Sequence, residues 1–110
     1  MPRPCKRRRV GCRPNSSYFK PAGIRKVELE ESVLAVDEFE AVRLKDYLNL
    51  DQNECSEKMN ISQPTFHRLI LSARKKIADA IVNGKAIKIE GGNFIFEEHH
   101  GRNSCGRHKQ

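Results

Sequence analysis

Apolar positions recur with the period of an α-helix in three stretches of the chain. Residues 36–48 carry such a stripe, with acidic residues in the first turns, where the helix dipole favours negative charge. Asp51 and Glu54 follow with the spacing of a capping box and predict a short helix over residues 52–59. A third stripe predicts a long helix over residues 62–82. Its apolar members are Phe66, Leu69, Ile70, Ala73, Ile77 and Ala80.

Local signals mark where the last two helices meet and end. Asn60 tolerates the left-handed backbone that a tight interhelical turn requires. Ser62 is a natural N-cap, and Pro64 fits the first turn of a helix, where its missing N–H is not needed. Asn83 and Gly84 supply a stop signal. The sequence therefore predicts two helices joined by a tight turn at Asn60.

Shorter apolar runs flank the helical region. Val27 and Leu29 alternate with charged neighbours, as in a short half-buried strand that pairs with a later segment. Residues 86–89 and 94–96 are two further runs around the pair Gly91-Gly92, which predicts a β-hairpin. Because a lone hairpin is only marginally stable in water, we expect it to pack on the helices.

These elements predict a mainly α fold, with a three-helix helix-turn-helix core, a short C-terminal β-hairpin and a basic extended N-terminal arm. We divide the chain into a Cys- and Pro-containing arm over residues 1–23, a DNA-binding domain over residues 24–96 and a flexible tail over residues 97–110. The arm holds four prolines and a turn-forming stretch, so we expect it to be ordered only where a partner or metal holds it. The tail is rich in His, Gly and Arg and has no periodicity.

The segment from Gln52 to Leu69 has the spacing that a helix-turn-helix requires. This motif needs a small residue early in its first helix, a turn residue that accepts left-handed geometry, and apolar residues where the helices meet. Ser56 and Asn60 fulfil the first two requirements. The joint spacing, more than any single match, indicates a DNA-binding motif. The expected shared core consists of Cys55, Met59, Ile61, Phe66 and Leu69.

The apolar stripe of the third helix leaves a polar face directed away from the core. We expect this face to read duplex DNA in the major groove, where Arg pairs preferentially with guanine. Clustered cations further along the helix suit phosphates, which supply affinity more than sequence information. For each candidate on this face, the alternative is that its polar side chain is only exposed to water and does not contact DNA. The candidates for contacts with base edges or phosphates are Gln63, Thr65, His67 and Arg68, with Ser62 and Ser72 as further DNA-binding residues, and those for phosphate contacts are Arg74, Lys75 and Lys76.

The distribution of charge supports this interpretation. The 110 residues have a net charge of +7, but residues 1–27 hold nine basic and no acidic side chains, residues 28–61 carry a net −7 and residues 62–89 a net +5. Basic segments on both sides of an acidic one suit a polyanion-binding surface that is backed by an acidic one. Basic arms of this kind also enter minor grooves. The candidate contacts in the arm are Arg3, Lys6, Arg7, Arg8 and Arg9.

Several motifs resemble an uncharacterised family of small prokaryotic proteins. They are Met1-Pro2-Arg3-Pro4 followed by a Cys/Arg/Lys cluster, VDEFEAVRL at residues 36–44, SQPTFHR at residues 62–68, and ARKKIADA at residues 73–80 continuing to Gly91-Gly92. The resemblance extends to Phe96. It implies DNA binding, because the middle of that family is similar to the helix-turn-helix of sigma-factor region four, which recognises a promoter element. It also implies a prokaryotic cytoplasm, and names neither a target sequence nor an effector.

The four cysteines raise the question of a metal. In a chain without an export signal we expect a reducing compartment, where disulfides are rare and cysteines are free thiols or metal ligands. Cys105 and His108 have a ligand-like spacing, whereas Cys5 and Cys12 are further apart than in a typical zinc knuckle. Because these residues fall in segments that otherwise look flexible, we expect no cofactor, with zinc as the alternative. Cys55 is expected in the core.

We therefore expect a sequence-specific DNA-binding protein, a transcriptional regulator, in the cytoplasm. An enzyme is not expected, because the chain has no glycine-rich phosphate loop and no recognisable Ser/His/Asp arrangement. No segment approaches the roughly 20 apolar residues of a membrane span. Double-stranded DNA is the expected partner, and a homodimer or a partner protein would supply a second half-site reader. The alternatives are an RNA polymerase-associated interaction module that docks through the acidic residues 37–46 and binds nucleic acid non-specifically, and a metal- or redox-sensing regulator.

Overall fold

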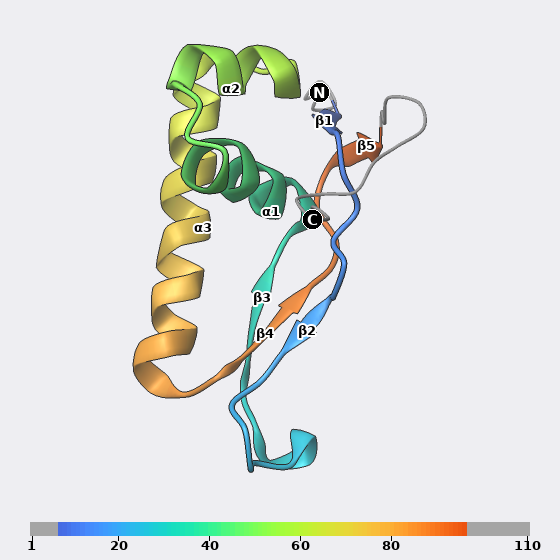
Figure 1. Cartoon of the computed structure of the whole chain (residues 1–110), viewed down its shortest axis with the longest axis vertical. Coiled ribbons are helices and arrows are strands. Elements are labelled where there is room, and N and C mark those ends of the chain that lie inside the picture. Colours follow the sequence, from blue (N-terminus) through green and yellow to red (C-terminus); the bar gives the residue numbers. More distant parts are fainter. Residues whose placement is uncertain (1–6, 97–110) are drawn as a thin grey trace, which may run out of the picture.

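The computed structural model describes residues 7–96 and combines three α-helices with two small β-sheets in this range (Figure 1). The long helix α3 runs along one side of the molecule and the strands along the other, with α1 between α3 and β1. None of the helices in the described range is long and apolar enough to cross a lipid bilayer. This mixture of helices and strands replaces the mainly α fold that the sequence predicted.

The first predicted helix is present, with a change of pitch near its end. α1 spans Val36–Val42 and continues as a π-helical turn, Arg43–Tyr47. The backbone N–H of Leu48 donates to the carbonyl of Arg43 at 2.8 Å, five residues back, which is the π-helical pattern. Leu44, inside this turn, is only 1% exposed and still points into the core.

The second and third predicted helices begin and end at the expected residues. α2 spans Gln52–Met59, and α3 spans Gln63–Asn83. The carboxylate of Asp51 accepts a hydrogen bond from the first turn of α2, and the hydroxyl of Ser62 does the same for α3. α3 ends at Gly84, whose φ of 68° is the left-handed conformation that ends many helices.

The described range contains five strands in two sheets. The larger sheet has the order β2 (Tyr18–Phe19), β4 (Ala86–Ile89), β3 (Glu31–Leu34), with β4 antiparallel to β2 and parallel to β3. The smaller sheet pairs β1 (Arg8–Val10) in parallel with β5 (Phe94–Phe96). The chain therefore passes from β3 through all three helices before it returns beside β3 as β4 (Figure 1).

The N-terminal segment is part of the fold and not an extended arm. β1 and β2 both lie within the predicted arm, and Val10 of β1 is fully buried. Strands of two or three residues show no period of their own, and their partners lie far away along the chain, so a local pattern does not reveal them. The prediction that residues 7–23 need a partner or metal to become ordered was wrong.

The glycine pair joins two sheets and does not form a hairpin turn. β4 and β5 pair with different strands, so the predicted β-hairpin was wrong. The carbonyl of Gly91 accepts the N–H of Val36 at 2.9 Å, and a Cβ on Gly92 would lie 2.6 Å from Oδ1 of Asp37. The pair therefore packs against the start of α1, where the absence of side chains allows the close approach.

The predicted strand at Val27 and Leu29 was also wrong. Lys26–Glu28 form a 3₁₀ turn in which Val27 is 84% exposed. The strand begins two residues after Leu29, as β3, and it does pair with a later segment, β4. Alternation over so few residues did not distinguish a strand from a turn that precedes one.

Two apolar clusters hold the helices to one another and to the strands. The first joins α1 and the π-helical turn to α2 and α3, and the second packs β1, β3 and β4 on α1 and α3. Burial of each large apolar side chain contributes about 1.5–3 kcal/mol. Cys55 is fully buried and free, as predicted. The first cluster contains Ala41, Leu44, Cys55, Met59, Phe66 and Ile70, and the second contains Val10, Leu34, Val36, Ala73 and Ile89.

Candidate nucleic-acid interface

The connection between α2 and α3 is a tight turn at Asn60. This residue has φ 60° and ψ 47°, which is the predicted left-handed conformation. The N–H groups of Asn60 and Ile61 donate to the carbonyls of Glu57 and Ser56 at 3.1 and 3.0 Å, so the last turn of α2 is satisfied. Ser56, the small residue that the spacing requires, is 3% exposed. The two helices are thus fixed by backbone hydrogen bonds as well as by their shared core.

Side chains tie the first turn of α3 to α2. The backbone N–H of Thr65 donates to Oγ of Ser62 at 3.3 Å, and the Ser62 hydroxyl donates to Oγ1 of Thr65 at 2.9 Å. Nε2 of Gln63 donates to Oδ1 of Asn53 in α2 at 3.0 Å. Gln63 therefore braces the two helices, a role that its sequence position did not indicate.

The predicted base-reading residues in the first turns of α3 lie at the surface. Ser62, Gln63, His67 and Arg68 are exposed, and Thr65 is half-buried. Among residues 7–96, neither His67 nor Arg68 has a hydrogen-bonding or ion-pairing partner. The polar face at the start of α3 is therefore available to a ligand.

A shallow hollow of about 590 Å³ adjoins this turn and brings the N-terminal basic segment beside α3. Nη1 of Arg8 lies 3.7 Å from Oδ2 of Asp37, and Nε of Arg8 is buried without a hydrogen-bond partner among the described residues. The positive charge of Arg8 is thus only loosely compensated, next to the first turn of α3. The hollow is lined by Arg8, Ser56, Glu57, Asn60, Ile61, Ser62 and Thr65.

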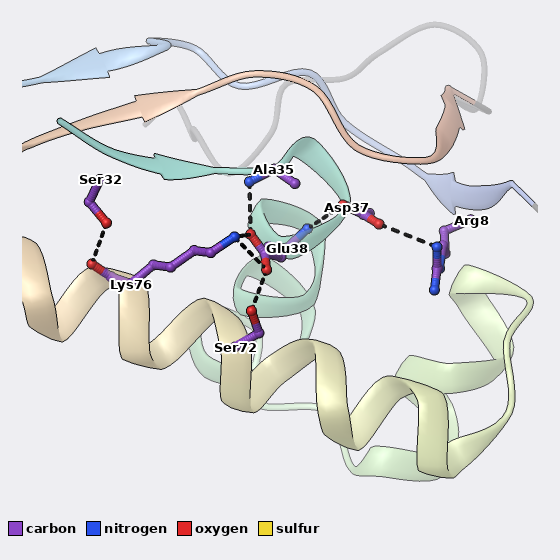
Figure 2. A network of polar contacts seen from close by, with 7 residues as sticks. All are labelled: Arg8, Ser32, Ala35, Asp37, Glu38, Ser72 and Lys76. Carbon is purple, nitrogen blue, oxygen red and sulfur yellow. Dashed lines mark hydrogen bonds and ion pairs between the residues drawn. The ribbon is translucent and has the colours of Figure 1, made fainter. Parts of the chain in front are cut away.

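Glu38 of α1 is the centre of a polar network that reaches α3 (Figure 2). Its carboxylate accepts hydrogen bonds from the Ser72 hydroxyl at 2.6 Å and from Nζ of Lys76 at 2.8 and 3.0 Å. It also accepts the backbone N–H of Ala35 at 2.8 Å. Burial works to raise the pKa of Glu38, but the hydrogen bonds from Lys76, Ser72 and Ala35 outweigh it and hold the pKa below its ordinary value.

This network changes the assignment of two predicted DNA contacts. Ser72 and Lys76 are half-buried, and Figure 2 shows both directed from α3 toward Glu38. Ser32 adds a further link, because its hydroxyl donates to the backbone carbonyl of Lys76 at 3.0 Å. The side chains of Ser72 and Lys76 therefore hold α1 against α3, and we assign them to the protein's own structure and not to a surface that faces DNA.

Arg74 and Lys75 differ in the partners they have within the protein. Arg74 makes a two-pronged contact with the carboxylate of Asp46, at 2.6 and 3.1 Å. The hydrogen bonds from Arg74 lower the pKa of Asp46 despite the opposing effect of burial. Lys75 is exposed and makes no ion pair with another described residue. Of the predicted phosphate contacts on α3, Lys75 alone makes no ion pair with another described residue, although its charge helps to lower the pKa of Asp79 after the hydrogen bonds from Lys85 and Asn83.

The acidic residues at the start of α1 are more than favourable partners of the helix dipole. Asp37, Glu38 and Glu40 are 4%, 5% and 2% exposed. Glu40 accepts two hydrogen bonds from the Arg43 guanidinium, both at 2.8 Å, and one from the N–H of Gly11 at 3.0 Å. Burial raises the pKa of Asp37, with Arg8 acting in the opposite direction. Three acids within four residues are expected on a solvated surface, so their burial could not be predicted from the sequence.

The remaining predicted contacts fall partly outside the described residues. Arg7 is exposed, and Arg8 and Arg9 are half-buried in β1. Cys12 is 5% exposed and takes part in a disulfide bond, contrary to the expected choice between a thiol and a metal ligand. No cluster of three metal-binding side chains occurs among residues 7–96. The predicted DNA-contacting and metal-binding residues that lie outside the described range are Arg3, Cys5, Lys6, Cys105 and His108.

The fold and this surface define a small α/β protein with a capped, polar helix start beside a tight interhelical turn. Residues 1–97 match the family model described as "Protein of unknown function DUF134", and the chain belongs to this family. The resemblance to an uncharacterised prokaryotic family is thereby confirmed.

Related proteins carry the description UPF0251 protein. One from Caldanaerobacter subterraneus subsp. tengcongensis is 60% identical over 94 residues, which cover 86% of this chain and 80% of the relative. One from Thermoanaerobacter sp. (strain X514) is 51% identical over 110 residues, covering 99% and 97%. One from Dehalococcoides mccartyi (strain BAV1) is 54% identical over 97 residues, covering 88% and 83%. No solved structure matches the chain.

Proposed function

We propose that this chain is a sequence-specific DNA-binding protein, a transcriptional regulator, in which α2, the Asn60 turn and α3 act as a helix-turn-helix. One observation carries the proposal. Two capped helices are joined through left-handed Asn60 over a shared core, while the first turns of α3 present polar side chains to solvent, of which His67 and Arg68 have no partner among the described residues. A helix that enters the major groove with its N-terminal residues needs this arrangement.

The proposed contacts divide into base-reading and phosphate-binding groups. Arg68 is the main candidate for base contacts, because a guanidinium recognises the edge of guanine with two hydrogen bonds. His67 and Gln63, which hydrogen-bonds to Asn53, are further candidates. Lys75 and Arg8 are the candidates for phosphates, since Lys75 makes no ion pair with another described residue and Arg8 is only loosely paired with Asp37. Ser72, Lys76 and Arg74 are assigned to the protein's own structure.

The same geometry weighs against a module that docks a partner through the acids of α1. Asp37, Glu38 and Glu40 are buried and already hydrogen-bonded, so little of their charge faces a partner. Asp46 is more exposed but pairs with Arg74. We therefore favour DNA binding over the RNA polymerase-associated alternative. A cytoplasmic location and the absence of catalysis are part of this proposal.

The experiment begins with the selection of genomic fragments by the purified protein, followed by electrophoretic shifts of a selected and an unselected fragment at two salt concentrations. Arg68→Ala is expected to weaken binding to the selected fragment by about 5- to 150-fold, which corresponds to about 1–3 kcal/mol, with little change for the unselected one. Lys75→Gln is expected to weaken both alike and to reduce the salt slope by about one.

Lys20→Gln is the matched control, because it removes the same charge at an exposed residue that lies near β2, away from α3. Its affinity and salt slope should equal those of the wild type. The proposal fails if the wild-type protein binds all fragments alike, or if Lys20→Gln weakens binding as much as Lys75→Gln does.

A further inference from the structure

The second half of α3 carries an exposed apolar face. Leu71, Ile81 and Val82 are 49%, 73% and 78% exposed, and Ala78 is exposed between them. At about 100° per residue, Leu71, Ala78 and Val82 fall within about 40° of one another around the helix. This stripe lies opposite the buried face of α3, so α1 and the strands do not cover it. Exposed apolar stripes with such spacing are typical of helix–helix interfaces.

We propose that this face packs against the same face of a second copy of the chain, with the two α3 helices antiparallel and crossing near Ala78. The inference rests on the proposed function for its geometry. From Thr65 to Ala78 is 13 residues, or about 20 Å along the helix at a rise of 1.5 Å. A two-fold axis at Ala78 therefore places the two starts of α3 about 39 Å apart.

This separation is close to one turn of DNA. Dimeric helix-turn-helix proteins place their reading helices about 34–36 Å apart, so that both enter the major groove on one side of the duplex. At about 100° per residue, Lys75 and Arg68 lie on the same side of the helix, about 40° and 60° from Leu71, so Lys75 borders the apolar stripe and Arg68 lies further from it. Two antiparallel copies therefore direct Arg68 of each copy toward one face of the dimer, where a single duplex reaches both, while Lys75 lies at the edge of the interface.

The charges beside the stripe favour the antiparallel over the parallel arrangement. A parallel pair in register would place Lys75 against Lys75 and Asp79 against Asp79, and like charges in such positions repel. An antiparallel pair that crosses at Ala78 brings Lys75 of one copy to within two residues of the position opposite Asp79 of the other. The overlap of the two helices contains Ala78, Ile81 and Val82 of each copy, because position 71 faces residue 85, beyond the end of α3. This makes a small interface, for which we expect weak association in solution and cooperative assembly on DNA.

Cysteine cross-linking tests the geometry of the pair. Ala78→Cys is expected to give a disulfide-linked dimer on mild oxidation, because residue 78 faces itself across the two-fold axis. Leu71→Cys is expected to give none, because its two copies would lie about 21 Å apart. The wild type, oxidised in the same way, corrects for the native cysteines. Cross-linking of both variants, or of neither, would overturn the antiparallel arrangement.

Sedimentation tests the face itself. Val82→Lys is expected to abolish concentration-dependent association and to replace a cooperative two-copy shift on DNA with a one-copy shift, because it would face Arg74 and Lys75 of the other copy. Val27→Lys is the control, because Val27 is similarly exposed but lies in the distant 3₁₀ turn. If the wild type stays monomeric both free and on DNA while it still selects fragments, this inference fails and the proposed function stands. If Val82→Lys abolishes association in a protein that binds no DNA, the proposed function fails and the interface stands.

Discussion

Nζ of Lys76 lies 2.8 Å from Oε1 of Glu38, and this contact fastens the middle of α3 to the start of α1. The lysine belongs to the basic run Arg74–Lys76, which composition alone assigns to a polyanion. The three neighbours have different roles in the structure. Arg74 pairs with Asp46, Lys76 pairs with Glu38, and Lys75 is exposed to solvent.

Loss of the Glu38 charge is expected to destabilise the protein. Glu38→Gln leaves the Lys76 ammonium without its counter-ion and removes one oxygen acceptor from a buried site. We expect the free energy of unfolding in urea to fall by about 1–3 kcal/mol. Asp37→Asn is the control, because it keeps an oxygen acceptor for the N–H of Glu38 while it removes a buried charge whose pKa is raised. A larger loss of unfolding free energy for Asp37→Asn than for Glu38→Gln would contradict the stabilising role of the Glu38–Lys76 contact.

The stability of the protein is expected to fall on acidification, and Glu38 is expected to be one source of that loss. The pKa of Glu38 is lower in the folded state than in the unfolded chain, so its contribution is complete above the ordinary Glu value of about 4.3 and is lost as the pH falls below it. Asp37 acts in the opposite sense, because protonation relieves its buried charge. Urea unfolding from about pH 7 to pH 3 should show a shallower acid loss for Glu38→Gln than for the wild type. An equal dependence of stability on pH in Glu38→Gln and the wild type would refute this role of Glu38.

Substitution of Gly92 tests how closely the chain packs against α1. Gly92→Ala would place a Cβ 2.6 Å from Oδ1 of Asp37, at a residue whose φ is +105°. We expect a loss of about 1–3 kcal/mol in stability, measured by thermal unfolding. Gly91→Ala meets no atom within 4 Å and has a φ of +78°, so it isolates the cost of backbone conformation. The close approach is disproved if the two variants lose the same stability.

The left-handed turn at Asn60 should tolerate glycine better than alanine. Asn60 has φ 60°, a region that glycine enters without strain and alanine only at a cost of about 1–2 kcal/mol. Urea unfolding should therefore rank Asn60→Gly at or near the wild type and Asn60→Ala below it. The reverse order would mean that the turn relaxes to another conformation.

The parts of the fold that the sequence predicted are those fixed by neighbours along the chain. Asp51, Ser62 and Gly84 mark helix ends through contacts within a few residues, and the structure confirms all three. The strands depend on partners far away. Val10 in β1 pairs with β5 and packs against Leu34, Val36, Ala73 and Ile89, and no pattern within residues 1–23 indicates these contacts.

The same distinction applies to the candidate site. The exposed start of α3 followed from its apolar stripe, because a helix with one buried face leaves the other in solvent. Which cations remain available there did not follow from the sequence. That depends on acids 28 to 38 residues away along the chain, since Asp46 and Glu38 neutralise Arg74 and Lys76. Separation of this kind leaves no local signal in composition or spacing.

The parallel pairing of β1 with β5 has a consequence for synthesis on the ribosome. Residues 8–10 emerge first but have no strand partner until residues 94–96 have been made. The helices form from local contacts as they leave the exit tunnel, whereas contacts between distant segments form more slowly. We therefore expect β1 to remain accessible to proteases and chaperones on nascent chains that end before residue 94, and to become protected only when β5 is free to bind it.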